Sequence, residues 1–228
     1  MARKRSRRYQ KVAAKVDRTK RYPVGEGIAL IKSLVGPKFD EAVDVAVRIG
    51  IDAKKTDQLV RGSVSLPKGT GKSVRIAVFA EGERAQEALA AGADFVGAAD
   101  LAEKIEQGFT DFDMTIASPD MMRFVGKLGK VLGPQGKMPS PKAGTVTPNV
   151  ANAVREFKAG KIEFRTDAGA NVHVAIGKKS FGVDDLASNL TAFLDHLRTL
   201  RPSQAKGTFI QKVVVSTSMG PGVMLAVE

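Results

Sequence analysis

The chain has 228 residues, 43% of them apolar, and carries a net charge of +12 at pH 7. A chain of this length can bury one large core or two small ones. Because it contains no cysteine, disulfide bonds and thiolate metal sites are excluded. No apolar run approaches about 18 residues, and no apolar signal core follows the basic N-terminal stretch, so we expect neither export nor membrane insertion. A cytoplasmic protein is the default.

The positive charge is concentrated near the N-terminus. Residues 1–21 hold ten basic residues and one acid, a net of +9, whereas the rest of the chain is nearly neutral. A basic arm beside a neutral body usually binds nucleic acid, and the alternative is a solubilising or targeting tail. We interpret residues 1–21 as a nucleic-acid arm.

The first third of the chain predicts two short helices and two strands. Residues 3–8 are too charged to fold alone, but residues 12–16 have the apolar spacing of one short helix. Apolar residues 28–34 predict a second helix, which Gly36 and Pro37 end. Residues 43–51 alternate apolar and polar side chains, as a strand with one buried face does, and a short strand is expected at 63–66.

The middle of the chain alternates strand and helix about every twenty residues. Each of three apolar runs precedes a helical pattern, and residues 150–158 predict one more helix. This pattern is typical of a small parallel sheet covered by helices. We therefore expect a Rossmann-like, three-layer α/β domain, with strands at 74–80, 95–96 and 114–117 and helices at 83–91, 99–107 and 120–131.

Residues 128–146 form a loop rich in Gly and Pro. They hold four Gly and three Pro, and this composition predicts neither helix nor strand. Loops of this length in compact domains are mostly functional or disordered, although a solvated connection is the alternative. Four lysines in or beside the loop favour a phosphate-bearing partner: Lys127, Lys130, Lys137 and Lys142.

The last third returns to an alternating pattern. Residues 162–164 and 172–176 predict a hairpin around 167–170, residues 186–197 a helix, and 209–215 with 223–227 a second hairpin. Because the outer segments share this pattern and the middle does not, we expect a split outer domain, residues 1–68 and 161–228, with an antiparallel-rich sheet and helices. An α/β domain, residues 69–160, would be inserted into it through two Gly- and Lys-rich hinges.

No catalytic constellation emerges. The run Gly69 to Ser73 lacks the earlier Gly of a phosphate-binding loop, since Leu66 stands there, and Lys137 is not followed by a hydroxyl residue. His173 and His196 belong to no metal or nucleophile motif, and Asp111 and Asp113 read as a pair on a solvated edge. We expect no enzyme, metal or cofactor; the alternative is a nucleotide-dependent enzyme with a small dinucleotide-type domain.

Five motifs cover nearly the whole chain: LGKVLGPQGKMP (128–139), KFDEAVDVAVRIGID (38–52), VRGSVSLPKGTGK (60–72), KAGKIEFRTD (158–167) and STSMGPGV (216–223). In sequence, order and spacing they resemble the motifs of the ribosomal protein L-one family, the bacterial type of large-subunit stalk protein. The chain departs from the family at Gln135, where Arg is common, at Lys137, where an apolar residue is common, and at Ser218, where Thr is usual.

The resemblance implies an RNA site on the outer domain. It carries over Phe39 and Glu41 in KFDE, and Ser218, Met219 and Gly220 in the SMG turn, with core packing as the alternative for Phe39 and Met219. A serine hydroxyl can donate to and accept from a ribose hydroxyl, and Gly permits close approach. Supporting phosphate contacts are predicted at Arg61 and Arg165.

The resemblance also implies the function and the partners. The protein would be a structural constituent of the large ribosomal subunit that anchors on large-subunit rRNA to form the mobile stalk. Its inserted domain would contact exit-site tRNA and assist its movement and release. Our own hypothesis is that the four lysines form the surface for this contact. It could also repress translation of its own operon mRNA. It would be a monomer off the ribosome.

Overall fold

The structure, a computed structural model, describes residues 5–226. Contacts divide the chain into two compact units. Unit 1 consists of Met1–Gly71 and Phe164–Glu228, and unit 2 of Lys72–Glu163. The boundaries expected from the sequence lie three residues earlier at each connection. The RNA-binding and inserted roles of these parts stay predictions.

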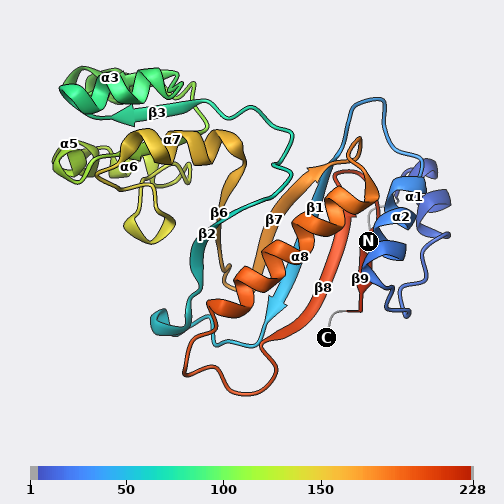
Figure 1. The fold of residues 1–228 in the computed structure, drawn as a ribbon. Helices are drawn as coiled ribbons and strands as arrows, with labels where there is room; N and C mark the ends of the chain where they lie inside the picture. The colour runs from blue at the N-terminus through green and yellow to red at the C-terminus, as the bar shows by residue number, and fades with distance from the viewer. Residues whose placement is uncertain (1–4, 227–228) are drawn as a thin grey trace. The chain divides into compact units, whose positions relative to one another are not determined.

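Unit 1 is built on a four-stranded antiparallel sheet in the order β7-β1-β8-β9 (Figure 1). Its elements are α1 (Arg7–Ala13), α2 (Val24–Ser33), β1 (Ala42–Ile49), η1 (Thr56–Gln58), β2 (Arg61–Ser65), β7 (Asn171–Lys178), α8 (Val183–Thr199), β8 (Ile210–Thr217) and β9 (Val223–Leu225). The strand β6 (Lys161–Arg165) crosses the boundary between the units and pairs with β2 in a separate two-stranded sheet.

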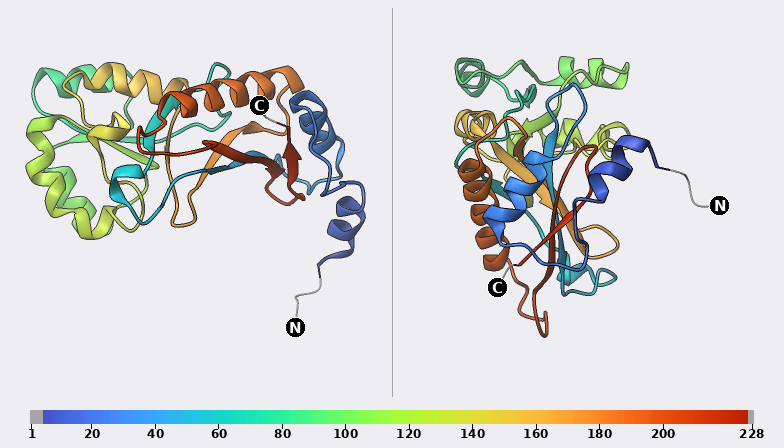
Figure 2. Two further views of the ribbon diagram at one scale, coloured as in Figure 1. Left: turned by 90° about the horizontal axis from the view of Figure 1, so that it is seen from below. Right: turned by 90° about the vertical axis from the view of Figure 1, so that its right-hand side faces the viewer.

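The alternation in β1 places its apolar side chains on one face. Val43, Val45, Val47 and Ile49 are all at most 1% exposed. The long helix α8 lies along one side of this sheet (Figures 1 and 2). It contributes five buried side chains: Leu186, Leu190, Phe193, Leu194 and Leu197. Burying this apolar face is the main term that holds unit 1 together.

The basic arm is more ordered than its charge predicts. The helix α1 begins at Arg7, inside the stretch that we expected to be too charged to fold; residues 1–4 lie outside the described range. Ser6 caps the helix by accepting a hydrogen bond from the Tyr9 amide at 3.3 Å. Val12 and Val16 are buried, as the apolar spacing predicts, so apolar packing compensates for the charge.

The first predicted hairpin is present only at its turn, where the Asp167 amide donates to the Asn171 carbonyl at 2.8 Å; the pairing predicted for its two strands is wrong. β6 pairs with β2, β7 pairs with β1, and the two strands meet only in an isolated antiparallel bridge between Thr166 and Val172. The Thr166 amide and hydroxyl both donate to the Val60 carbonyl, at 3.0 and 3.2 Å. These bonds direct the chain towards β2, a partner too distant in sequence for local patterns to identify. The second hairpin, β8 with β9, is confirmed.

Unit 2 is a three-layer α/β unit, as the alternation predicts. Its three strands are parallel in the order β4-β3-β5. Ala77 and Phe79 of β3 belong to one apolar cluster with α4 and α5, whereas Ile76 and Val78 belong to another with α3 and α7. The elements are β3 (Ile76–Phe79), α3 (Glu83–Ala90), β4 (Phe95–Gly97), α4 (Ala99–Glu106), β5 (Met114–Ala117), η2 (Pro119–Met121), α5 (Met122–Lys127), α6 (Gly129–Leu132), η3 (Pro141–Ala143) and α7 (Val150–Ala159).

Two expectations about unit 2 need correction. The single helix predicted at 120–131 is divided into η2, α5 and α6, since Gly126 and Gly129 weaken its continuity. The Gly/Pro loop, predicted to hold no helix, contains α6 and η3. Leu128 and Leu132 are fully buried, and this packing outweighs the low helix propensity of the surrounding residues.

Candidate nucleic-acid interface

The SMG turn (residues 218–220) joins β8 to β9 and lies beside the start of β1. Backbone and side chain of Ser218 both bond to Ala42: the Ser218 amide donates to the Ala42 carbonyl at 3.1 Å, and the Ala42 amide donates to Ser218 Oγ at 3.2 Å. Because Oγ accepts in this contact, its own proton remains available to donate to a ligand. Ser218 and Met219 are both exposed.

Gly220 is required by the turn itself. Its amide donates to the Thr217 carbonyl at 3.0 Å. A Cβ at this position would collide with the buried Thr217 hydroxyl oxygen. Gly220 therefore keeps the turn tight, which is a structural role in addition to the close approach proposed from the sequence.

Glu41 is buried beneath the turn. It is 1% exposed, and its Oε1 accepts a hydrogen bond from the Met219 amide at 2.9 Å. Its Oε2 lies 3.4 Å from Lys179 Nζ, which also donates to the Leu34 carbonyl at 2.6 Å. Any Cβ at position 36 would collide with the same carboxylate, so Gly36 is needed here. Glu41 thus positions the turn from below.

The loop between α2 and β1 and the SMG turn both carry exposed apolar side chains. Phe39 is 57% exposed, Met219 51% and Val35 65%, so core packing is excluded for Phe39 and Met219. Asp40 fixes the loop, because its carboxylate accepts from the Ser180 amide at 3.1 Å and from the Ser180 hydroxyl at 2.8 Å. Exposed apolar side chains held on a fixed backbone suit the face of a sugar or base.

The basic arm reaches this turn through Arg8. One guanidinium nitrogen donates to the Val35 carbonyl and the other to the Met219 carbonyl, both at 3.2 Å. The two exposed apolar residues are therefore held by one side chain of α1. The sequence patterns identified neither Arg8 nor Val35: no motif marks Arg8 among its basic neighbours, and Val35 lies next to Leu34 at the end of a helical pattern without a signal of its own.

Arg61 and Arg165 do not join the turn. Arg61 follows Val60 and Arg165 precedes Thr166, and Thr166 bridges to Val172, which pairs with Val47 near the other end of β1. The turn lies at the Val43 end, because Val43 pairs with Thr217. Val43 and Val47 are four positions apart on β1, about 13 Å, and both arginines lie beyond the Val47 end in the separate sheet of β2 and β6. A role of either arginine in the same contact as Ser218 is not supported by this arrangement.

The lysines of unit 2 differ in their surroundings. Lys127, Lys130 and Lys142 are exposed. Lys137 instead donates to the Thr110 carbonyl at 2.9 Å, and its Nζ lies 5.0 Å from the centre of the Phe112 ring. Lys137 therefore ties the Gly/Pro loop to the segment after α4, a role for which the sequence gives no signal.

The residues considered for catalysis have structural partners. Asp111 pairs with Arg75 at 2.5 Å, and Asp113 pairs with Lys72 at 2.7 Å, which lowers the pKa of Asp113. His173 lies 3.4 Å from Asp167, and His196 packs against the edge of Phe164. Within residues 5–226, no group of three or more His, Cys, Asp or Glu side chains could hold a metal ion. None of the helices that the structure describes is long and apolar enough to cross a bilayer.

The comparisons with known proteins agree with these features. The model of the ribosomal protein L1p/L10e family matches residues 30–221. The large ribosomal subunit protein uL1 of Bordetella pertussis is 59% identical over 219 residues, which cover 96% of this chain and 94% of that protein. The proteins of the same name from an Azoarcus species and from Ralstonia nicotianae are each 56% identical, over 96% of this chain and 94% and 95% of theirs. The chain belongs to the ribosomal protein L1p/L10e family.

Proposed function

We propose that the protein is a structural, non-enzymatic constituent of the large ribosomal subunit, located on cytoplasmic ribosomes, that anchors on a folded segment of large-subunit rRNA through unit 1. One observation supports the anchoring site: a serine hydroxyl and three exposed apolar side chains lie on the turn and on the loop bonded to it, and Glu41 and Arg8 fix the backbone of the turn. With no Trp and two Tyr in the chain, the protein reads shape, ribose hydroxyls and phosphates more than stacked bases.

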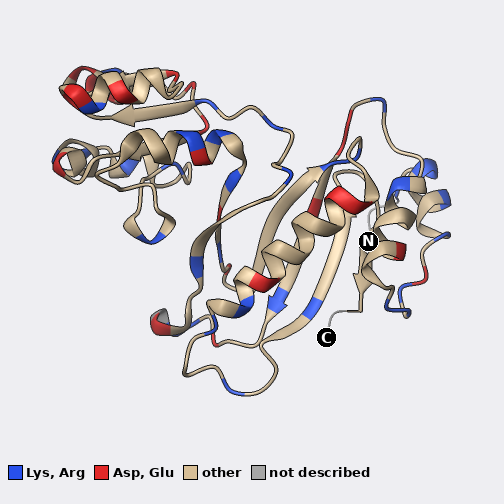
Figure 3. Ribbon diagram, in the orientation of Figure 1, with Lys and Arg blue, Asp and Glu red and all other residues tan. Residues whose placement is uncertain are grey.

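Charge supports the same proposal. The basic segments drawn in blue in Figure 3 include the N-terminal helices of unit 1, next to the loop that carries Phe39. Phosphate neutralisation supplies affinity, whereas the hydroxyl and apolar groups of the turn supply selectivity for a particular RNA fold.

The finer roles follow from the resemblance and extend the proposal. Unit 2 would act as the arm that contacts exit-site tRNA, through the exposed Lys127, Lys130 and Lys142. The RNA site of unit 1 would also accept a similar fold in the protein's own operon mRNA and so repress translation. Off the ribosome the protein would be a monomer.

A nucleotide-dependent enzyme is the less favoured alternative. The parallel sheet of unit 2 would place a pyrophosphate at the N-terminus of α3, after β3. There Glu81 and Glu83 flank Gly82, and both acids are exposed. Two carboxylates at this point would repel a phosphate, so we expect the pure protein neither to bind nor to hydrolyse nucleotides.

Deleting unit 2 tests the anchoring site. A variant that joins Gly71 to Lys161 by a short Gly linker keeps β6 whole, so that it can still pair with β2. We expect it to fold and to retain most of the affinity of the intact protein for rRNA fragments, measured by filter binding or calorimetry. A folded variant that binds no rRNA would contradict the assignment of the site to unit 1.

A further inference from the structure

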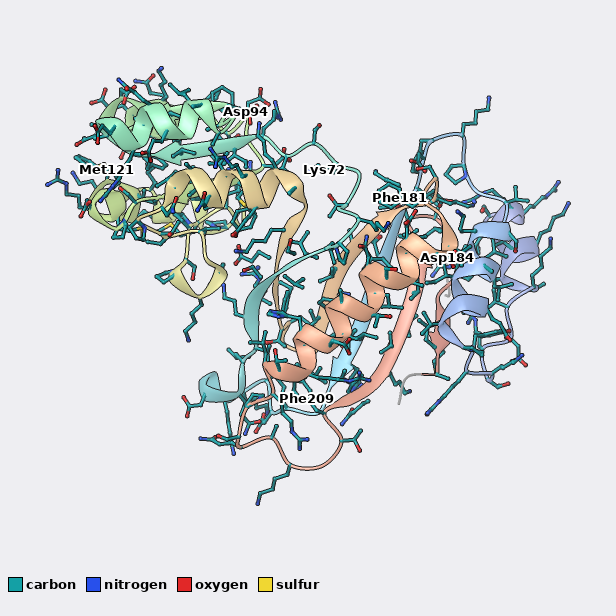
Figure 4. The ribbon with its side chains drawn as sticks, in the orientation of Figure 1. Lys72, Asp94, Met121, Phe181, Asp184 and Phe209 are labelled. Atoms are coloured by element: carbon teal, nitrogen blue, oxygen red, sulfur yellow. The ribbon has the colours of Figure 1, made fainter. Side chains whose placement is uncertain are left out.

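The end of the unit 1 sheet opposite the SMG turn contains a hollow of about 910 Å³. The end of β1, the loop after it, the turn at residues 168–170 and the loop between α8 and β8 form its walls. In Figure 4, the label Phe209 lies at the end of unit 1 that contains the hollow, and the label Phe181 lies at the end near the SMG turn. We call this feature the Arg48 hollow.

The hollow is positively charged. Arg48, Lys54 and Lys206 line it and are all exposed. Among the lining residues, Asp52 carries the opposing charge, and its carboxylate accepts a hydrogen bond from the Lys54 amide at 3.1 Å. Asp167 precedes the wall at 168–170, and its carboxylate accepts from the amides of Gly169 and Asn171 at 2.8 and 2.7 Å. The hollow thus has three cations and two nearby carboxylates, and both carboxylates already accept hydrogen bonds from backbone amides.

Cross-strand pairing adds a further cation beside the hollow. Arg48 on β1 lies directly opposite Lys212 on β8. Both side chains are exposed, and like charges opposite each other in a sheet destabilise it. Figure 3 shows the blue segments of these two strands next to each other. An anionic ligand would relieve this repulsion.

The backbone that carries these cations is fixed. The Arg201 guanidinium donates to the carbonyls of Ala205 and Gly207 at 3.0 and 2.9 Å, on either side of Lys206. Gly50 donates to the Phe209 carbonyl at 2.7 Å, and any Cβ at position 50 would collide with the Thr208 carbonyl. The loop between α8 and β8, which carries Lys206, therefore lies against the end of β1 and is held there by hydrogen bonds and close packing.

We propose that the Arg48 hollow is a second, phosphate-binding contact for the same folded RNA that binds at the SMG turn. This inference rests on the proposed function. Val43 and Gly50 are seven positions apart on β1 and its extension, so the two contacts are separated by about 23 Å. The turn contacts ribose and base surfaces, whereas the hollow neutralises backbone phosphates and so adds affinity without base readout.

The salt dependence of RNA binding tests the proposal. The triple variant Arg48→Gln, Lys54→Gln, Lys206→Gln removes three charges, and each lost phosphate contact lowers the log–log salt slope by about 0.7 to 0.9. We therefore expect the slope for an rRNA fragment to fall by roughly 2 to 3. The matched control removes three exposed charges from unit 2, Lys104→Gln, Arg123→Gln and Arg155→Gln, and should leave the slope unchanged. An unchanged slope in the hollow variant, with its fold intact by circular dichroism, would refute the second contact.

Directed cleavage locates the two contacts on the RNA. Because the natural chain has no cysteine, single cysteines can carry a tethered iron chelate. Thr208→Cys keeps all the charges of the hollow, and Val35→Cys reports on the turn. We expect both to cut the bound RNA, at two separate places. Cleavage by Val35→Cys alone would refute the hollow and leave the proposed function standing; absence of RNA binding by the unsubstituted protein would refute both.

The remaining possibility is that the hollow binds a single small anion and not RNA. Titration with inorganic phosphate and with a mononucleotide, followed by calorimetry, separates it from an RNA contact. We expect no saturable binding of either at millimolar concentration, because single phosphates lack the multiple contacts of an RNA backbone. Saturable binding that the triple variant abolishes, together with an unchanged RNA salt slope, would overturn the assignment to RNA.

Discussion

The buried carboxylate of Glu41 accepts a hydrogen bond from the backbone amide of Met219 at 2.9 Å, although 178 positions of sequence separate the two residues. Through this contact and the pair with Lys179, the start of β1 determines where the SMG turn lies. The family motifs KFDE and SMG, distant along the chain, therefore form one structural unit.

Removing this carboxylate should destabilise unit 1. Glu41→Ala leaves the Met219 amide and the Lys179 ammonium without their acceptor, and breaking a buried pair in this way costs about 3 kcal/mol. Glu41→Gln retains one acceptor oxygen and should cost less. Urea unfolding measures both. If Glu41→Ala is as stable as the natural protein but binds no rRNA, then Glu41 contacts the RNA directly and our positioning role is wrong.

Arg8 should contribute more to RNA recognition than its charge alone. Arg7→Gln and Arg8→Gln each remove one charge of the arm, so both should lower the salt slope by a similar amount, up to about 0.9. Only Arg8→Gln releases the Val35 and Met219 carbonyls. We therefore expect it alone to reduce the ratio of cognate to non-specific affinity, and Arg8→Lys to restore the charge without restoring that ratio. Equal ratios in all three variants would show that the arm acts by charge only.

The Ser218 hydroxyl should be needed for cognate RNA. Ser218→Val leaves a ribose hydroxyl unpaired, which should cost on the order of 1–3 kcal/mol in cognate binding while non-specific binding is spared. Ser218→Thr keeps the hydroxyl and serves as the control. Filter binding with cognate and unrelated RNA provides the measurement. Equal losses on both RNAs would remove Ser218 from the site.

The exposed lysines of unit 2 should affect tRNA and not stability. Replacing Lys127, Lys130 and Lys142 by Gln should change the free energy of unfolding by less than about 0.5 kcal/mol for each exposed site. Ribosomes reconstituted with this variant should show lower exit-site tRNA occupancy or slower translocation, because long-range attraction is lost. Lys137→Met is the comparison: it removes the bond to Thr110 and should affect stability more than occupancy.

If the Gly/Pro loop has only a structural role, its glycines should matter for stability and its lysines should not matter for tRNA. Gly136 and Gly144 both have positive φ, 70° and 71°, so Gly144→Val should destabilise unit 2 through backbone strain. If it does so while the triple lysine variant leaves occupancy and translocation rate unchanged, the lysines are only a solvated surface.

Asp167 should make the stability of unit 1 depend on acid pH. Hydrogen bonds from the backbone and side chain of Asn171, with that of the Gly169 amide, lower the pKa of Asp167 from 3.8 to about 2. Because the folded-state pKa is the lower one, the carboxylate adds stability above about pH 4, and this contribution is lost as the pH falls from about 4 to about 2. Asp167→Asn should therefore be less stable than the natural protein at neutral pH and equally stable near pH 2. A difference independent of pH would mean that the charge plays no part.

Local patterns predicted most elements of this protein. The alternation of apolar and polar residues identified β1, because one face of that strand is buried. Apolar runs followed in turn by helical patterns identified the parallel sheet of unit 2. Errors arose where packing outweighed propensity. A helix extends into the Gly/Pro loop because Leu132 is buried, and the Val60 carbonyl, distant in sequence, accepts from Thr166 where β6 pairs with β2 instead of β7.

In the candidate site, too, local sequence explains some features and the tertiary structure explains the others. The sequence by itself determined which residues could contact RNA, since hydroxyl, apolar and basic groups are properties of residue type, and the motif resemblance selected Phe39, Ser218 and Met219 among them. Only the tertiary structure decided how each acts. Glu41 lies beneath the turn instead of on its surface, and the arginines expected to assist lie in the separate sheet of β2 and β6. Hydrogen bonds between residues far apart in the chain fix these positions, and no local pattern encodes them.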